Sequence, residues 1–186
     1  LILKINKGIN GEKTFLDIGA NDGMTRSSSY ILECLGWSGV LVEPNPSLIP
    51  TIKCHRPNSI LLNCALGQES SIETLVTSSS LSGLGTLSQK TNEKNIQRLV
   101  KECAENNYII ENHHVIQIEA HKVFEFTEKY LNSTISYLKI DAEGSEDVIL
   151  NSIYTNIQPN RYPIFLEIEN NYRDEVKNHC VSKYYQ

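Results

Sequence analysis

The segment FLDIGANDG, residues 15–23, constrains the fold of this chain more than any other stretch. Its apolar start predicts a buried strand over residues 14–18, and Gly19 is expected to end that strand. Apolar residues then recur at helical spacing over residues 27–35, and Gly36 is expected to stop this helix. A strand that turns through glycine into a helix predicts the start of an alternating α/β fold.

The alternation continues in two parts of the chain. In the first part, an apolar strand at residues 40–42 is followed by a helix at 47–55 and a third strand at 59–66. In the second part, ISYLKIDAEG (135–144) forms a strand and a turn before a helix, and PIFLEIENN (163–171) forms a final strand. We therefore predict a mostly parallel sheet with helices on both faces.

The middle of the chain has a less regular pattern. Residues 72–76 predict an added strand, and residues 115–119 alternate like a half-buried strand. The serine- and glycine-rich residues 77–89 are expected to form a flexible loop, and residues 78–88 of it are expected to close over the site as a lid. Helices are expected at residues 92–105 and 121–131.

Composition limits the class of protein. The 186 residues are 40% hydrophobic and 21% charged, and they show no repeat or linker, so residues 1–186 are predicted to form a single domain. A net charge of −5 argues against a nucleic-acid partner, and no apolar run reaches membrane-spanning length. The five cysteines lack zinc-binding spacing, which predicts reduced thiols and a cytoplasmic location.

Two acids and two glycines predict a ligand site. In an open parallel sheet, ligands bind beyond the carboxyl ends of the strands, where the strand order reverses. Gly19 and Gly23 permit positive φ and a close approach of the backbone at that point. Glu43 ends the second strand, 26 residues after Asp17 (43 − 17), where an acid can accept hydrogen bonds from a ribose diol.

The charge of the turn indicates which nucleoside ligand it takes. A dinucleotide site prefers G-x-G-x-x-G, and the third glycine is missing here. Asp17 and Asp22 suit a ligand with positive charge better than a pyrophosphate. This pattern favours S-adenosylmethionine over NAD, and an NAD-dependent enzyme is the less favoured alternative.

Several ordered blocks of the chain, roughly from Thr14 to Tyr172, resemble the FkbM-type methyltransferases. These blocks are FLDIGANDG, LGWSGVLVEPNP, RPNSILLNCALG and SYLKIDAEGSEDVIL, with Ser27, Ser28 and Glu33 in the first helix. The resemblance implies the fold of class I S-adenosylmethionine-dependent methyltransferases, a Rossmann-like α/β sheet. The chain ends soon after its last predicted strand, so the terminal antiparallel hairpin usual in that class is expected either to be missing or to be completed by residues outside this sequence.

The resemblance also implies a function. Many members of the family methylate hydroxyl oxygens, so the expected acceptor is a glycan, a sugar or a small metabolite. The alternative is a non-catalytic scaffold or binding module that retains the fold. Asp17, Glu43 and Asp141 argue against this alternative, because a site without a ligand has no need of them.

The cofactor-binding residues that the resemblance implies lie at the ends of four strands. Asp17 and Gly19 would line the methionine end, Glu43 would hold the ribose, and Asp141 would face the methionyl group or the acceptor. The full set is Asp17, Gly19, Asn21, Gly23, Glu43, Pro44, Asn45, Cys64, Ala65 and Asp141.

Catalytic candidates lie in the segment KIDAEGSE, residues 139–146. Lys139 and Asp141 share one face of their strand because side chains alternate. Glu143 precedes a glycine beyond the strand end and is predicted to act in the reaction. Glu146 is either a site acid or an acid in the first turn of a helix.

A metal site is a further hypothesis. Neighbouring strands that end in Asp141 and in Glu169 and Asn170 would supply oxygen ligands for Mg²⁺. The same acids could equally act as bases or hold a polar acceptor.

Overall fold

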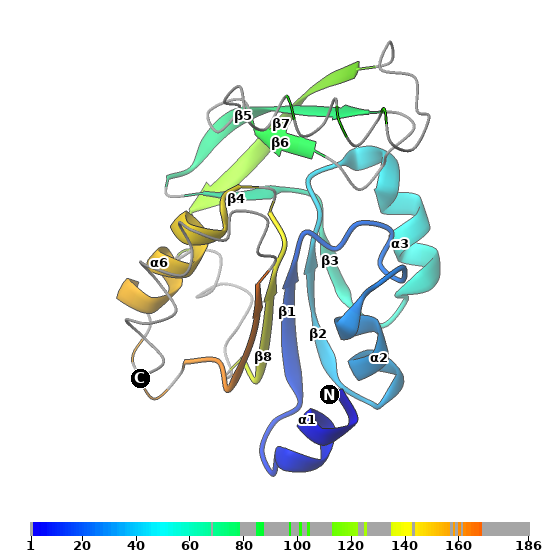
Figure 1. The fold of residues 1–186 in the computed structure, drawn as a ribbon, viewed down its shortest axis with the longest axis vertical. Helices are drawn as coiled ribbons and strands as arrows, with labels where there is room; N and C mark the ends of the chain where they lie inside the picture. The colour runs from blue at the N-terminus through cyan, green and yellow to red at the C-terminus, as the bar shows by residue number, and fades with distance from the viewer. Residues whose placement is uncertain are drawn as a thin grey trace.

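The computed structural model contains two sheets and the helices around them (Figure 1). The residues it describes are 2–67, 69–78, 85–87, 113–122, 135–142, 144–156 and 162–168, with the single positions 97, 101, 104, 125, 158 and 160. Residues 76–78, 85–87 and 113–122 are described by their backbone alone.

The central sheet has five parallel strands, as the alternation predicts. The strands are β1 (Thr14–Ile18), β2 (Ser38–Val42), β3 (Ile60–Leu62), β8 (Tyr137–Ile140) and β9 (Phe165–Ile168). Their spatial order is β3-β2-β1-β8-β9, so the order reverses between β1 and β8. Ligands of open parallel sheets bind at the carboxyl ends of strands beside such a reversal.

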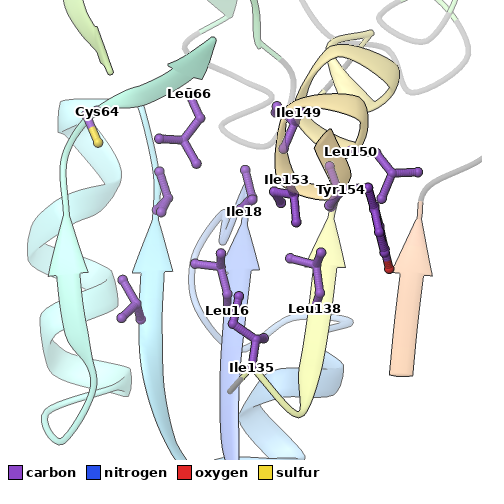
Figure 2. Packing of buried hydrophobic residues seen from close by; sticks show 13 residues of the cluster. Leu16, Ile18, Cys64, Leu66, Ile135, Leu138, Ile149, Leu150, Ile153 and Tyr154 are labelled. Carbon is purple, nitrogen blue, oxygen red and sulfur yellow. The ribbon is translucent and has the colours of Figure 1, made fainter. Parts of the chain in front are cut away.

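Helices cover both faces of this sheet, which confirms the α/β prediction. The helices are α1 (Ile2–Gly8), α2 (Ser28–Cys34), the 3-10 turn η1 (Pro46–Leu48), α3 (Ile49–His55) and α6 (Glu146–Asn156). Ile149 and Ile153 of α6 pack on Leu16 and Leu138 on one face (Figure 2).

On the other face, the apolar residues of three helices surround Phe15 of β1 and Leu41 of β2. They are Ile5 of α1, Leu32 of α2 and Ile52 of α3. Both faces therefore bury apolar surface, which stabilises the sheet between two helical layers.

A second sheet lies beyond the carboxyl ends of the central strands (Figures 1 and 2). Its strands are β4 (Ala65–Gly67), β5 (Ser71–Ser78), β6 (Gly85–Leu87) and β7 (His113–Lys122), in the order β4-β7-β5-β6. The strands predicted at residues 72–76 and 115–119 are both confirmed within β5 and β7. Leu66 of β4 packs with the α6 cluster, which joins the two sheets.

Three expectations about elements are wrong. The third strand is not continuous over residues 59–66, because the chain leaves β3 at Leu62 and enters the second sheet at Ala65. In the expected loop, residues 77–78 belong to β5 and residues 85–87 pair with β5, and residues 121–122 belong to β7 instead of a helix. The pairings of β4 and β5 with β7 are long-range, and local residue preferences do not reveal them.

The remaining expectations of the middle segment fall mostly outside the described residues. These are residues 79–84 and 88–89 of the expected loop and most of the helices at 92–105 and 121–131. Helix α1 was not predicted. In the described part of the chain, no helix has the length and apolar character needed to cross a bilayer.

Candidate functional site

The turn after β1 is shaped by two glycines. Gly19 has φ +81° and Gly23 has φ +79°, so the positive φ expected at both is confirmed. A Cβ atom on Gly19 would lie 1.8 Å from the backbone oxygen of Asp141. A Cβ atom on Gly23 would lie 3.0 Å from Arg56 and 3.2 Å from Ile52. Both glycines therefore allow this chain's own groups to pack closely.

Glu43 ties this turn to the end of β2. The Asn21 N–H donates to Oε2 of Glu43 at 2.8 Å, and the Asn45 N–H donates to Oε1 at 2.9 Å. Each carboxylate oxygen therefore keeps a second lone pair for another donor. Burial raises the pKa of the Glu43 carboxyl to about 7, against the lowering effect of the hydrogen bonds from Asn45 and Asn21.

Asn21 has an unusual conformation for a residue other than glycine. Its φ is +52°, in the left-handed region that asparagine tolerates better than most residues. This conformation aims its N–H at Glu43. Its side-chain oxygen Oδ1 is buried and has no hydrogen-bond partner in the described structure.

The residues after Glu43 support its backbone. The side-chain oxygen of Asn45 accepts hydrogen bonds from the N–H and the hydroxyl of Ser47, at 3.0 and 2.7 Å, and so caps η1. Asn63 donates from Nδ2 to the carbonyl oxygens of Glu43 and Pro44, at 2.8 and 3.0 Å. Asn63 was not predicted as a site residue, because the apolar run around it predicts a continuous third strand.

Cys64 and Ala65 lie beyond β3. Cys64 is 5% exposed and packs in the α6 cluster with Ile18 and Val42, while Ala65 begins β4. The structure therefore places both at the crossing from the central sheet to the second sheet, near the carboxyl end of β2. Their predicted proximity to adenine stays a prediction.

Asp17 is completely buried at the carboxyl end of β1. Its oxygen Oδ2 accepts hydrogen bonds from the hydroxyls of Ser29 and Ser27, both from the start of α2. Its other oxygen, Oδ1, has no hydrogen-bond partner among the described residues. The start of α2 thus fixes the orientation of the carboxylate, and Oδ1 is left to face the ammonium of Lys139.

Lys139 brings Asp17 and Asp141 together. Its ammonium nitrogen Nζ lies 3.4 Å from Oδ1 of Asp17 and 3.3 Å from Oδ2 of Asp141. Burial lowers the pKa of Lys139, but attraction to Asp17 and Asp141 outweighs burial and raises this pKa. Lys139 therefore carries a proton at neutral pH and is poorly suited to accept one from an acceptor hydroxyl.

Arg56 is a buried residue that the sequence analysis missed. Its Nε donates to Glu33, and its Nη1 donates to the Gly23 carbonyl at 3.0 Å and to the Ser29 hydroxyl at 3.1 Å. The guanidinium also lies 5.3 Å from the centre of the Phe15 ring. Because Ser29 in turn donates to Asp17, Arg56 links the end of α3 to the site.

Asp22 has a local structural role. Its Oδ1 accepts hydrogen bonds from the N–H groups of Met24 and Thr25, at 2.9 and 2.7 Å. Burial raises the pKa of Asp22, but these hydrogen bonds and the one from the Thr25 hydroxyl outweigh burial and lower this pKa. The Asp22 carboxylate thus stabilises the loop. Of the two acids expected to attract a positively charged ligand, only Asp17 remains as a candidate for that role.

Glu146 is the first residue of α6 and braces the loop before it. Its carboxylate accepts hydrogen bonds from the N–H groups of Ala142 and Gly144, at 2.9 and 3.0 Å. This arrangement favours the interpretation of Glu146 as a helix first-turn acid over that of a site acid. Glu143 lies outside the described residues.

The magnesium hypothesis has no support in the described part of the chain. No group of three or more histidine, cysteine, aspartate or glutamate side chains is placed there to hold a metal ion. Asp141 already faces the cation of Lys139. Glu169 and Asn170, the other predicted ligands, lie outside the described residues.

One comparison with known proteins identifies a family. A family model described as the "Methyltransferase FkbM domain" matches residues 17–181. The match begins at Asp17 and includes Glu43, Lys139 and Asp141. No curated protein and no solved structure matches the chain significantly.

Proposed function

This chain belongs to the FkbM methyltransferase family, and we propose that it transfers a methyl group from S-adenosylmethionine to a hydroxyl oxygen. The proposed acceptor is a sugar, a glycan or a small metabolite. The observation that carries the proposal is the buried carboxylate of Glu43, held by two backbone N–H groups at the end of β2. A carboxylate held in this way is ready to accept hydrogen bonds from ribose hydroxyls.

An unpaired acceptor at the site fits this cofactor. Oδ1 of Asn21 is buried without a hydrogen-bond partner among the described residues, whereas Oδ1 of Asp17 has an ion pair with Lys139. Buried polar atoms normally have partners, so the unpaired oxygen of Asn21 suits a ligand that brings a donor. S-adenosylmethionine carries an amino group and two ribose hydroxyls, which are donors of the required kind.

Different residues of the site contact different parts of S-adenosylmethionine. In this proposal, Glu43 and Asn21 hold the ribose, and Asp17 and Gly19 line the methionine end. Pro44 and Asn45 fix the approach of Glu43, and Gly23 shapes the turn. Cys64 and Ala65 lie near adenine.

S-adenosylmethionine supplies the methyl group on a sulfonium. During transfer the carbon–sulfur bond breaks, a carbon–oxygen bond forms, and the acceptor hydroxyl loses its proton. We assign this proton to Asp141 or Glu143, because a sugar hydroxyl needs a base to become a good nucleophile. The Asp141 side chain is 33% exposed, which leaves it open to an acceptor.

Residues 1–186 are proposed to act as one domain, with the second sheet covering the carboxyl ends of the central strands (Figure 1). A reducing, cytoplasmic location belongs to the same proposal, because Cys34 and Cys54 are exposed thiols.

The first test is binding and turnover. S-adenosylmethionine and S-adenosylhomocysteine should each raise the melting temperature, and NAD should not. Labelled methyl transfer across a panel of sugars and metabolites should then reveal the acceptor class. Melting curves unchanged by both sulfur compounds would overturn the proposal, whereas binding without transfer to any acceptor would favour the non-catalytic scaffold.

Glu43→Ala tests the ribose site. This substitution should weaken S-adenosylmethionine binding by about 1–3 kcal/mol, because ribose hydroxyls would lose their acceptor. Isothermal titration calorimetry measures the change, and Glu12→Ala, an exposed acid before β1, is the matched control. Wild-type affinity in Glu43→Ala would show that the ribose binds elsewhere.

Chelation tests the metal hypothesis separately. If transfer requires Mg²⁺, EDTA should abolish it and added Mg²⁺ should restore it. Full activity in EDTA would instead assign the reaction to the protein's own side chains.

A further inference from the structure

Three charged side chains meet where β1 and β8 end. Lys139 lies opposite Asp17 in the pairing of the two strands, and Asp141 follows two residues later on the same face. The ammonium of Lys139 lies 3.3–3.4 Å from a carboxylate oxygen of each acid and 3.5 Å from the carbonyl oxygen of Gly19. The two carboxylates therefore share one internal cation.

A third acid lies on the far side of this cation. Glu167 of β9 is opposite Lys139 in the next strand pairing, and its carboxylate accepts a hydrogen bond from the Tyr137 hydroxyl. Lys139 is only 8% exposed, so little water screens its charge from the site. Any charged ligand group at the ends of β1 and β8 therefore interacts electrostatically with the Lys139 ammonium as well as with the carboxylates.

We propose that Lys139 is a specificity-determining residue that limits the preference of this site for positively charged S-adenosylmethionine over its neutral product, S-adenosylhomocysteine. The inference rests on the proposed function, because it concerns the same cofactor. The two compounds share the adenosine, amino and carboxylate groups and differ in the methyl group and the charge on sulfur. Asp17 and Asp141 attract the sulfonium charge, and Lys139 offsets that attraction.

The proposal has a consequence for turnover. A site with two carboxylates and no cation would bind the sulfonium much better than the neutral sulfide. With Lys139 present, the product retains a comparable affinity and competes with fresh cofactor. S-adenosylhomocysteine is therefore expected to inhibit the protein at concentrations close to those at which S-adenosylmethionine binds.

A charge series at residue 139 tests the proposal. Lys139→Met keeps a long side chain and removes the charge, while Lys139→Arg keeps the charge and is the matched control. Calorimetry on each variant gives the dissociation constants of both compounds, and their ratio is unaffected by any inactive fraction of the sample. In Lys139→Met this ratio should shift about tenfold toward S-adenosylmethionine, as expected for one unit charge several ångströms from the sulfur. In Lys139→Arg the ratio should stay near that of the wild type.

A second variant keeps the test decisive if Lys139→Met fails to fold, since that change leaves Asp17 buried without its cation. Asp141→Asn removes a negative charge from a partly exposed side chain, and it should shift the ratio in the opposite direction. An unchanged ratio in every folded variant would overturn the role of Lys139. If wild-type protein binds neither compound, the proposed function itself fails, and the two failures are thus distinguished.

Discussion

β1 and β8 run side by side in the central sheet. They place different kinds of side chain on its two faces. On the face covered by α6, they contribute leucines and isoleucines, among them Leu16 and Leu138, which are fully buried (Figure 2). On the face covered by α1, α2 and α3, the same strands contribute Asp17 and Lys139, which are also buried. The strands are shared, so the difference arises from the alternation of side chains along them.

The two faces of the sheet are stabilised in different ways. Apolar packing is not directional, so a shortened side chain on the α6 face leaves a cavity and loses contacts. On the face covered by α1, α2 and α3, the charged face, two buried ions have partners of opposite charge: Asp17 has Lys139, and Arg56 has Glu33. Removing one partner there leaves an uncompensated charge, which is costlier than a cavity of similar size.

The largest effect is expected from Arg56→Met. The substitution keeps much of the apolar stem of Arg56 but leaves Glu33, 12% exposed, without its cation. The free energy of unfolding should fall by about 3–5 kcal/mol, the usual result of breaking a buried ion pair. Urea unfolding monitored by circular dichroism measures the loss.

Two variants separate pairing from packing in this experiment. Arg56→Met combined with Glu33→Leu should regain part of the stability, because no unpaired charge remains. Lys53→Met, on an exposed position of the same helix, should change stability by less than about 0.5 kcal/mol. A double variant as unstable as Arg56→Met alone would mean that packing, not charge pairing, dominates this face.

Leu138→Ala probes the opposite face and should have a somewhat smaller effect. Leu138 is fully buried among apolar neighbours, so its truncation should cost about 2–4 kcal/mol of unfolding free energy. The dissociation constant of S-adenosylmethionine should stay near the wild-type value in the folded protein. Leu3→Ala, at a position 63% exposed, is the matched control. Weakened binding in Leu138→Ala would show that the two faces are coupled.

The fold was predictable because its signals are local. The apolar runs, the glycines after strands and the helical spacing of residues 27–35 all lie within short windows, and they correctly indicate a parallel sheet with helices on both faces. Helix α2 lies within one residue of its predicted range. The division of the third strand between two sheets was missed, because β4 gains its partner from β7, which begins 46 residues after β4 ends (113 − 67).

The strand-end positions of the candidate site residues were predictable, but their contacts were predictable only in part. Asp17, Lys139 and Asp141 were each predicted near the carboxyl end of a strand, yet which groups they contact depends on the pairing of β1 with β8 across more than 100 residues. Arg56 gave no signal, because its burial depends on α2 packing beside α3. For Asp22 the sequence did contain a signal, because an aspartate before glycine often binds nearby backbone N–H groups. That local role could have been predicted in place of a role in attracting a ligand.

The pH dependence of stability gives the smallest and most selective test of the charged face. Burial raises the pKa of the Glu43 carboxyl from 4.5 to about 7, so the folded protein holds this proton more tightly than the unfolded chain. The unfolded chain therefore binds fewer protons between these values, and stability falls as pH rises through this window. Between pH 5 and pH 6.5 the loss should be about 1–2 kcal/mol in urea titrations.

Three variants test whether Glu43 causes the slope of unfolding free energy against pH. Glu43→Gln cannot titrate, so its stability should vary less with pH than that of the wild type, whereas Glu12→Gln, at an exposed position, should keep the wild-type slope. Leu138→Ala should also keep the slope while being less stable at every pH, because a cavity on the α6 face binds no proton. An identical slope in wild type and Glu43→Gln would assign the titration to other groups. Parallel curves for Leu138→Ala and wild type, with a flatter curve for Glu43→Gln, would assign the proton-dependent stability to the charged face.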